Sequence, residues 1–98
     1  MKNAQKMYDV EMTEETKAPT PKQLEVLRAF YDAAKANYPP PTMRELRRRL
    51  SVSHNAVFER ISWLEKKGHL AKSPGERRCF VITGSGVTWV RRSIEDAG

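Results

Sequence analysis

Three consecutive prolines, Pro39-Pro40-Pro41, constrain the fold of this chain more than any other feature. A proline breaks a helix and restricts the residue before it to extended backbone, so no helix continues through this segment. Apolar residues recur at helical spacing on both sides of the prolines. The sequence therefore predicts separate helices joined by an extended connector.

The first helix is predicted to begin at Thr20-Pro21 and to end before the three prolines. Threonine is a good N-cap, and proline at the first helical position loses no hydrogen bond. Its apolar stripe consists of Leu24, Leu27, Phe30, Tyr31 and Ala34.

The second helix is predicted to begin at Thr42, because Thr42 and Glu45 have the spacing of a capping box. In this motif each side chain accepts a hydrogen bond from the backbone N–H of the other residue. Met43, Leu46 and Leu50 form the predicted buried stripe of this helix.

A third helix is predicted over residues 53–67 after a short polar turn, with Ser53 as its N-cap and Gly68 as its stop. At about 100° per residue, its core face consists of Val57, Ile61 and Leu64. The opposite side carries Asn55, Glu59, Ser62 and Lys66.

Beyond Gly68 the pattern changes to that of short strands. Residues 69–72 and 79–83 are rich in strand-forming side chains, and turn-forming residues separate them. Ser85 is predicted to cap a final short helix. The predicted fold class is α+β, mostly α: a winged helix-turn-helix with three helices, a β-hairpin wing with its tip at residues 73–78, and a short C-terminal helix.

Positive charge is concentrated in the middle of the chain. The net charge is +6, yet residues 21–83 alone carry 13 Lys and Arg against six Asp and Glu. A basic domain of this kind favours a polyanionic partner such as nucleic acid. We therefore divide the chain into a mobile N-terminal arm (1–19), a DNA-binding domain (20–83) and a C-terminal short helix and tail (84–98).

Other classes of protein are excluded by what the sequence lacks. The single cysteine, Cys79, cannot form an internal disulfide, and with His54 and His69 it does not make a zinc site. No apolar run approaches the ~20 residues that span a bilayer, and the N-terminus has no signal peptide. No carboxylate pair, Gly-rich phosphate loop or Ser/His/Asp arrangement is apparent. We expect a cytoplasmic, nucleoid-associated protein with no enzyme activity, cofactor, metal site, membrane partner or evident small-molecule effector.

A helix presented to the DNA major groove needs a polar face that reads base edges. Asparagine pairs with adenine, glutamate accepts from cytosine, and serine pairs with several bases, while an aromatic ring contacts thymine methyls. These chemistries predict base reading by Asn55, Phe58, Glu59 and Ser62. Contacts to the DNA backbone, or through the wing, are predicted for Thr42, Arg44, Arg47, Arg48, His54, Lys66, Arg77 and Arg78.

Residues 20–83 resemble the N-terminal DNA-binding domain of LexA-type repressors. The matching stretches are Thr20–Leu27, Pro40–Leu46, Ser53–Ala56 and Leu64–Leu70. The most specific are the Pro-Pro-Thr entry to the second helix and the Ser-x-Asn-Ala start of the third. The resemblance implies that operator DNA is read through Ser53, Asn55, Ala56, Phe58 and Glu59.

The sequence departs from this family in two places. The family usually has Glu at the position of Phe58, so the base preference there is expected to differ. LexA-type repressors continue into a Ser/Lys self-cleaving domain that also dimerises them, whereas this chain ends at residue 98. The resemblance therefore implies the DNA-binding half alone, without self-cleavage.

We predict a sequence-specific double-stranded DNA-binding transcriptional regulator, a small repressor of bacterial or phage type that binds a palindrome as a homodimer. The dimer contact would come from residues 1–18 or from the final helix around Trp89 and Val90. The simpler interpretation of residues 1–18, which we favour, is a disordered tail. Packing of the final helix back onto the first helix is as well supported as a dimer contact there. The alternative function is a winged-helix protein–protein interaction or assembly module, for instance in replication or host-protein inhibition.

Overall fold

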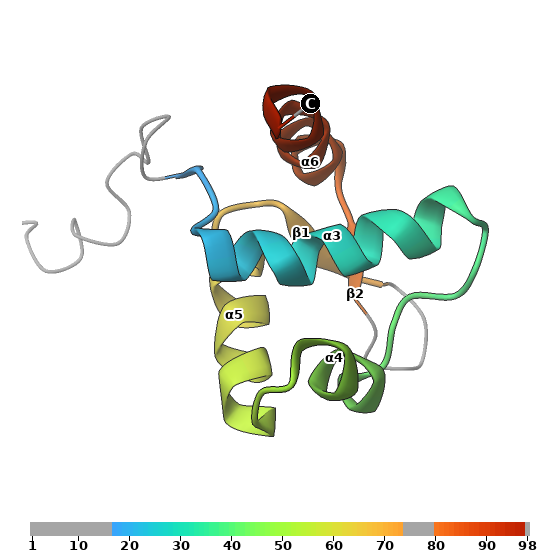
Figure 1. Cartoon of the computed structure of the whole chain (residues 1–98), viewed down its shortest axis with the longest axis vertical. Coiled ribbons are helices and arrows are strands. Elements are labelled where there is room, and N and C mark those ends of the chain that lie inside the picture. The colour runs from blue at the N-terminus through green and yellow to red at the C-terminus, as the bar shows by residue number, and fades with distance from the viewer. Residues whose placement is uncertain (1–16, 74–79, 98) are drawn as a thin grey trace, which may run out of the picture.

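A computed structural model describes residues 17–73 and 80–97 of the chain, and Figure 1 shows the arrangement of their elements. In chain order these elements are α3 (Pro21–Lys35), α4 (Met43–Leu50), α5 (His54–Lys66), β1 (Leu70–Lys72), β2 (Phe80–Ile82) and α6 (Gly84–Ala97). Helix α3 crosses the middle of the molecule, with α6 above it and α4 and α5 below it in Figure 1. The described residues thus form the mostly helical winged helix-turn-helix that the sequence predicts. Most of the predicted arm and of the wing tip lies outside them.

The predicted starts of three helices are confirmed. The Thr20 hydroxyl accepts from the backbone N–H of Gln23, and the Gln23 side chain accepts from the backbone N–H of Thr20, both at 3.1 Å. Thr42 and Glu45 make the same pair of bonds at 3.1 and 2.9 Å. The Ser53 hydroxyl accepts from the third backbone N–H of α5 at 3.2 Å. These local bonds fix where each helix begins.

The hydrophobic core lies between α3 and the elements around it. Its buried apolar residues are Val26, Leu27, Ala29, Phe30, Tyr31, Leu46, Val57, Ile61, Leu64, Leu70 and Val90. The predicted core face of α5 is therefore confirmed. The prediction that Ala34 belongs to the buried stripe of α3 is wrong, because the last turn of α3 extends past α4 and α6 and leaves Ala34 exposed (Figure 1).

The two strands pair antiparallel, with Leu70 opposite Ile82 and Lys72 opposite Phe80. The chain reaches β1 from α5 through Gly68, whose φ of +86° lies in the region that favours glycine. This turn directs the hairpin away from the end of α5. It also places the buried Leu70 in the core.

Helix α6 differs from its prediction at its start and in its packing. It is capped by Thr83, whose hydroxyl accepts from the Gly86 N–H at 3.1 Å, so the prediction that Ser85 caps it is wrong. Val90 is 1% exposed and belongs to the core, so it cannot form an exposed seam with Trp89. Helix α6 therefore packs back onto α3, which was one of the two alternatives. None of the helices in the described ranges has both the length and the apolar character needed to cross a membrane.

Candidate nucleic-acid interface

The N-terminal end of α5 and the whole of α4 lie along one edge of the molecule, at the bottom of Figure 1. A turn of three residues, Ser51–Ser53, joins the two helices. Ser51 has a φ of +55°, and its backbone N–H donates to the carbonyl of Arg47. The left-handed backbone conformation of Ser51 ends α4, and α5 begins three residues later at His54.

The outward side of α5 carries the residues that were predicted to read bases. Ser53, Asn55 and Glu59 are exposed, whereas Ala56 and Ser62 are half-buried. The Ser53 hydroxyl already accepts a hydrogen bond from within the helix, so its proton remains available to a ligand. The structure thus brings most of the predicted reading residues together on one accessible face.

Phe58 lies on the same accessible part of α5 and is 57% exposed. A phenyl ring left in water carries unburied apolar surface, which a contact with a partner would remove. The ring therefore adds an apolar contact point to an otherwise polar reading face.

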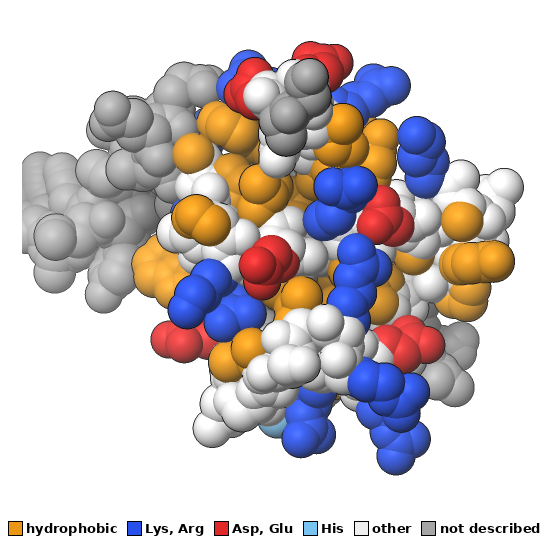
Figure 2. Space-filling view, in the orientation of Figure 1, with side chains coloured by type: hydrophobic (Ala, Val, Ile, Leu, Met, Phe, Trp, Pro, Cys, Tyr) orange, Lys and Arg blue, Asp and Glu red, His pale blue; other side chains and the backbone are white. Residues whose placement is uncertain are grey.

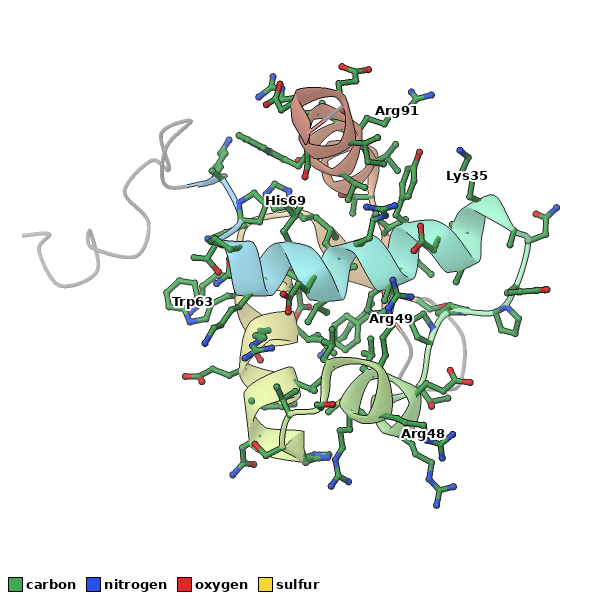
Figure 3. The ribbon with its side chains drawn as sticks, viewed as in Figure 1. Lys35, Arg48, Arg49, Trp63, His69 and Arg91 are labelled. Atoms are coloured by element: carbon green, nitrogen blue, oxygen red, sulfur yellow. The ribbon has the colours of Figure 1, made fainter. Side chains whose placement is uncertain are left out.

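Three arginines of α4 surround the turn. Arg44, Arg47 and Arg48 are exposed, and with the residues of the turn they line a surface hollow of about 450 Å³. None of the three forms an ion pair within the described ranges. Figure 2 shows Lys and Arg side chains along this lower edge, and in Figure 3 Arg48 points away from the body. The positive charge beside the reading face is therefore free to meet an anion.

Arg49 differs from its neighbours because it points toward α3 (Figure 3). Its guanidinium lies 3.0 Å from the Asp32 carboxylate, which Arg28 also contacts at 3.2 Å. Partial burial alone would raise the pKa of Asp32, but hydrogen bonds from Arg49 and Arg28 outweigh it and hold this pKa below its ordinary value. Sequence reasoning missed this link, which fixes the end of α4 to α3.

The remaining predicted backbone contacts are more scattered. Thr42 and His54 are exposed at the starts of α4 and α5. The Lys66 ammonium lies over the Trp63 ring, 4.8 Å from its centroid, and about 16 Å along α5 from Asn55 at 1.5 Å per residue. Arg77 and Arg78 lie outside the described residues. Lys66 is therefore not part of the cluster at the lower edge.

The other end of α5 is fastened to the segment that leads into α3. The Lys67 ammonium donates to the carbonyl of Ala18 at 2.9 Å and to the side-chain oxygen of Gln23 at 2.7 Å. Burial lowers the pKa of Lys67, because removing water disfavours the charged form. The reading helix is thus anchored at the end opposite to its exposed N-terminus.

His69 makes a second link at this end and is fully buried. Its Nε2 lies 2.6 Å from the carbonyl oxygen of Lys17, and its Nδ1 lies 2.8 Å from the Ser85 hydroxyl. A carbonyl oxygen only accepts hydrogen bonds, so Nε2 carries a proton. His69 therefore joins the segment before α3 to the first turn of α6.

Comparison with known proteins agrees with this geometry. Residues 16–79 match the family described as LexA DNA binding domain. The chain is 36% identical over 72 residues to the LexA repressor of Lactiplantibacillus plantarum, covering 72% of this chain and 34% of that protein. It is 40% identical over 68 residues to the LexA repressor of Lactobacillus acidophilus, covering 68% of this chain and 33% of that protein. The chain thus spans about a third of the length of these curated relatives. No solved structure matches it.

Proposed function

This chain belongs to the LexA DNA binding domain family, and on that premise we propose that it binds double-stranded DNA at specific sequences and represses transcription. The observation that carries the proposal is the exposed polar face of α5 beside Arg44, Arg47 and Arg48, which form no ion pair within the described ranges. Its relatives carry the name LexA repressor, which supports the regulatory role. The proposal involves no enzyme chemistry.

In the proposed complex, α5 enters the major groove with its N-terminus first. Asn55 pairs with adenine through two hydrogen bonds, and Glu59 accepts from the amino group of cytosine. Phe58 contacts a thymine methyl group. Ser53 donates its hydroxyl proton to a base, and the half-buried Ala56 and Ser62 line the sides of the contact.

Other residues contact the DNA backbone beside this helix. Arg44, Arg47 and Arg48 meet the phosphates of one strand, and Thr42 and His54 lie beside them. These contacts set the position of the protein on the duplex and carry little sequence information. Further phosphate or minor-groove contacts are assigned to Lys66, Arg77 and Arg78.

We also propose that the chain binds a palindrome as a homodimer and that residues 20–83 form its DNA-binding unit, with the arm before it and α6 after it. Two reading helices related by a twofold axis meet half-sites about one helical turn apart. Because Val90 is buried in its own core, the contact between copies falls to the N-terminal residues or to the outer side of α6. Sedimentation of the chain with a palindromic duplex would show two copies per duplex. One copy at saturation would contradict the dimer.

Alanine at Asn55 and at Glu59 tests the reading face. Each change should lower the discrimination between the preferred duplex and one mismatched at the base read by that residue, by ~1–3 kcal/mol, or about 5- to 150-fold. Binding would be measured by fluorescence anisotropy. Lys35→Ala, on an exposed side chain of α3 far from this edge (Figure 3), is the matched control. Unchanged discrimination in both reading-face variants, with the fold intact, would favour an interaction module instead.

A further inference from the structure

The structure contains a hydrogen-bonded corner at the base of the β hairpin, which we call the hairpin corner and define as Gly68, His69, Thr83 and Gly86. The Thr83 backbone N–H donates to the carbonyl of His69 at 3.0 Å, which continues the strand ladder one step beyond the Leu70–Ile82 pair. The ladder therefore ends at the point where α5 stops and α6 starts.

The Thr83 hydroxyl joins these two helices directly. It donates to the carbonyl oxygen of Gly68 at 2.7 Å and accepts from the Gly86 N–H at 3.1 Å. A hydroxyl has one proton to donate, and the Thr83 hydroxyl donates it to the Gly68 carbonyl. One atom thus links the end of the reading helix, the base of the hairpin and the start of α6.

The hairpin corner leaves little room for movement. A Cβ atom at Gly86 would lie 2.5 Å from the His69 carbonyl oxygen and 2.8 Å from the Ile82 side chain. The backbone of α6 therefore lies directly against the start of β1. His69 is also held from the side by Ser85, 2.8 Å from its ring nitrogen.

The hairpin itself is short, with three paired positions in each strand. An isolated two-stranded hairpin of this size is marginal, so its direction depends on what holds its base. At ~3.3 Å per residue, a rotation of about 15° at the corner moves the end of the ladder by ~2–3 Å. That displacement exceeds the tolerance of a hydrogen bond to a phosphate.

We propose that Thr83 is a positioning residue for DNA binding: its hydroxyl bond to Gly68 sets the angle of the wing to the reading helix. We assign no direct DNA contact to Thr83. It acts through the ladder of β1 and β2, which connects it along the chain to Arg77 and Arg78, the residues that the proposed function assigns to DNA contacts. The proposal rests on the proposed DNA-binding function and adds a residue that neither the charge pattern nor the reading face identifies.

The test compares Thr83→Val, which removes the hydroxyl at constant shape, with Thr83→Ser, which keeps it. The slope of log K against log salt reports the number of phosphate contacts, at about 0.9 per phosphate. Thr83→Val should lose one or two phosphate contacts, so its slope becomes shallower by ~1–2, while discrimination at the base read by Asn55 is retained. Thr83→Ser should keep the slope of the original chain.

A merely structural role makes a different prediction. In that case Thr83→Val would lower the thermal midpoint while all three proteins share one salt slope, and the proposal would be overturned. If Thr83→Val does not fold, Thr83→Asp replaces it, because a carboxylate accepts from Gly86 and caps α6 but cannot donate to Gly68. Thr88→Asp adds the same charge at an exposed position of α6 without removing a bond of the hairpin corner, because the Thr88 hydroxyl donates to the Gly84 carbonyl instead. Equal slopes for these two variants would also overturn the proposal.

Failure of this inference can be told apart from failure of the proposed function. If the original chain shows no sequence preference, the proposed function fails. The salt slope can still be measured on non-specific DNA, where phosphate contacts supply the binding. The comparison of Thr83→Val with Thr83→Ser therefore decides the inference in either case.

Discussion

Several polar side chains in this molecule join elements that are distant in sequence. Asp32 is one example, because its carboxylate joins Arg28 of its own helix to Arg49 of α4. Thr83 and His69 do the same at the other end of the fold. The orientation of α4 and α5 therefore depends on a few such groups as well as on the core.

The Asp32 link predicts a pH dependence of stability. Its folded pKa lies below the ordinary 3.8, so its stabilising contribution is present above about pH 4 and is lost as pH falls through the folded pKa. Asp32→Asn should cost less than about 1 kcal/mol at pH 7, because the carboxylate is 40% exposed and solvent screens the pair. Urea unfolding at pH 7 and pH 3 measures both values. The difference between the two proteins should shrink at pH 3; a difference that grows there would contradict the assignment.

At the scale of elements, α6 is held to the hairpin by close backbone approach at Gly86. Gly86→Ala should destabilise the fold by ~1–3 kcal/mol, because the new methyl group meets a backbone carbonyl that cannot rotate away. Gly84→Ala is the matched control in the same turn, since nothing lies within 4 Å of its added Cβ atom. Thermal unfolding followed by circular dichroism would compare them. Equal midpoints would show that α6 is not tightly docked at this corner.

The elements were predictable from sequence where their signals are local. Thr20, Thr42 and Ser53 cap helices through bonds to residues three positions on, so short motifs identify them. Thr83 and Ser85 are both good capping residues, and the sequence offers no way to choose between them. In the folded chain the Thr83 hydroxyl donates to the Gly68 carbonyl, and the Ser85 hydroxyl lies against the His69 ring. These contacts between distant residues decide that Thr83 is the cap.

The candidate site was predictable to a similar extent. The period of α5 separates its core face from its exposed face, and that division is confirmed. The run of arginines in α4 gave no sign that Arg49 turns inward, because its partner Asp32 belongs to another helix. The sequence also did not reveal the bonds of Lys67 and His69 to backbone carbonyls. Every residue has such a carbonyl, so no sequence pattern singles out the partner.

At the level of the whole molecule, three exposed arginines of α4 lie at the edge that presents the N-terminal end of α5. Arg44, Arg47 and Arg48 are exposed beside the N-terminal end of α5, whereas Arg49 pairs with Asp32 of α3 at the surface. Figure 2 also shows Lys and Arg side chains elsewhere on this face, so the lower edge differs in combining positive charge with the exposed face of α5.

Arg48 and Arg49 provide a matched test of this division. Arg48→Ala should weaken binding to all DNA sequences about equally and make the salt slope shallower by ~0.9, the value for one phosphate contact. Arg49→Ala should leave the slope unchanged and lower the stability instead, because it breaks the pair with Asp32. Binding titrations at several salt concentrations, with urea unfolding, measure both effects. A reversed pattern would assign the phosphate contact to Arg49.

The proposed function requires that the exposed face of α5 reads DNA sequence. Selection of bound duplexes from a random pool, sequenced after binding at low and at physiological salt, tests that claim most directly. We expect enrichment of one short motif, arranged as a palindrome and sharper at the higher salt, because salt weakens non-specific phosphate binding. A pool that stays random at both salt concentrations, while the protein is folded and binds DNA, would contradict it.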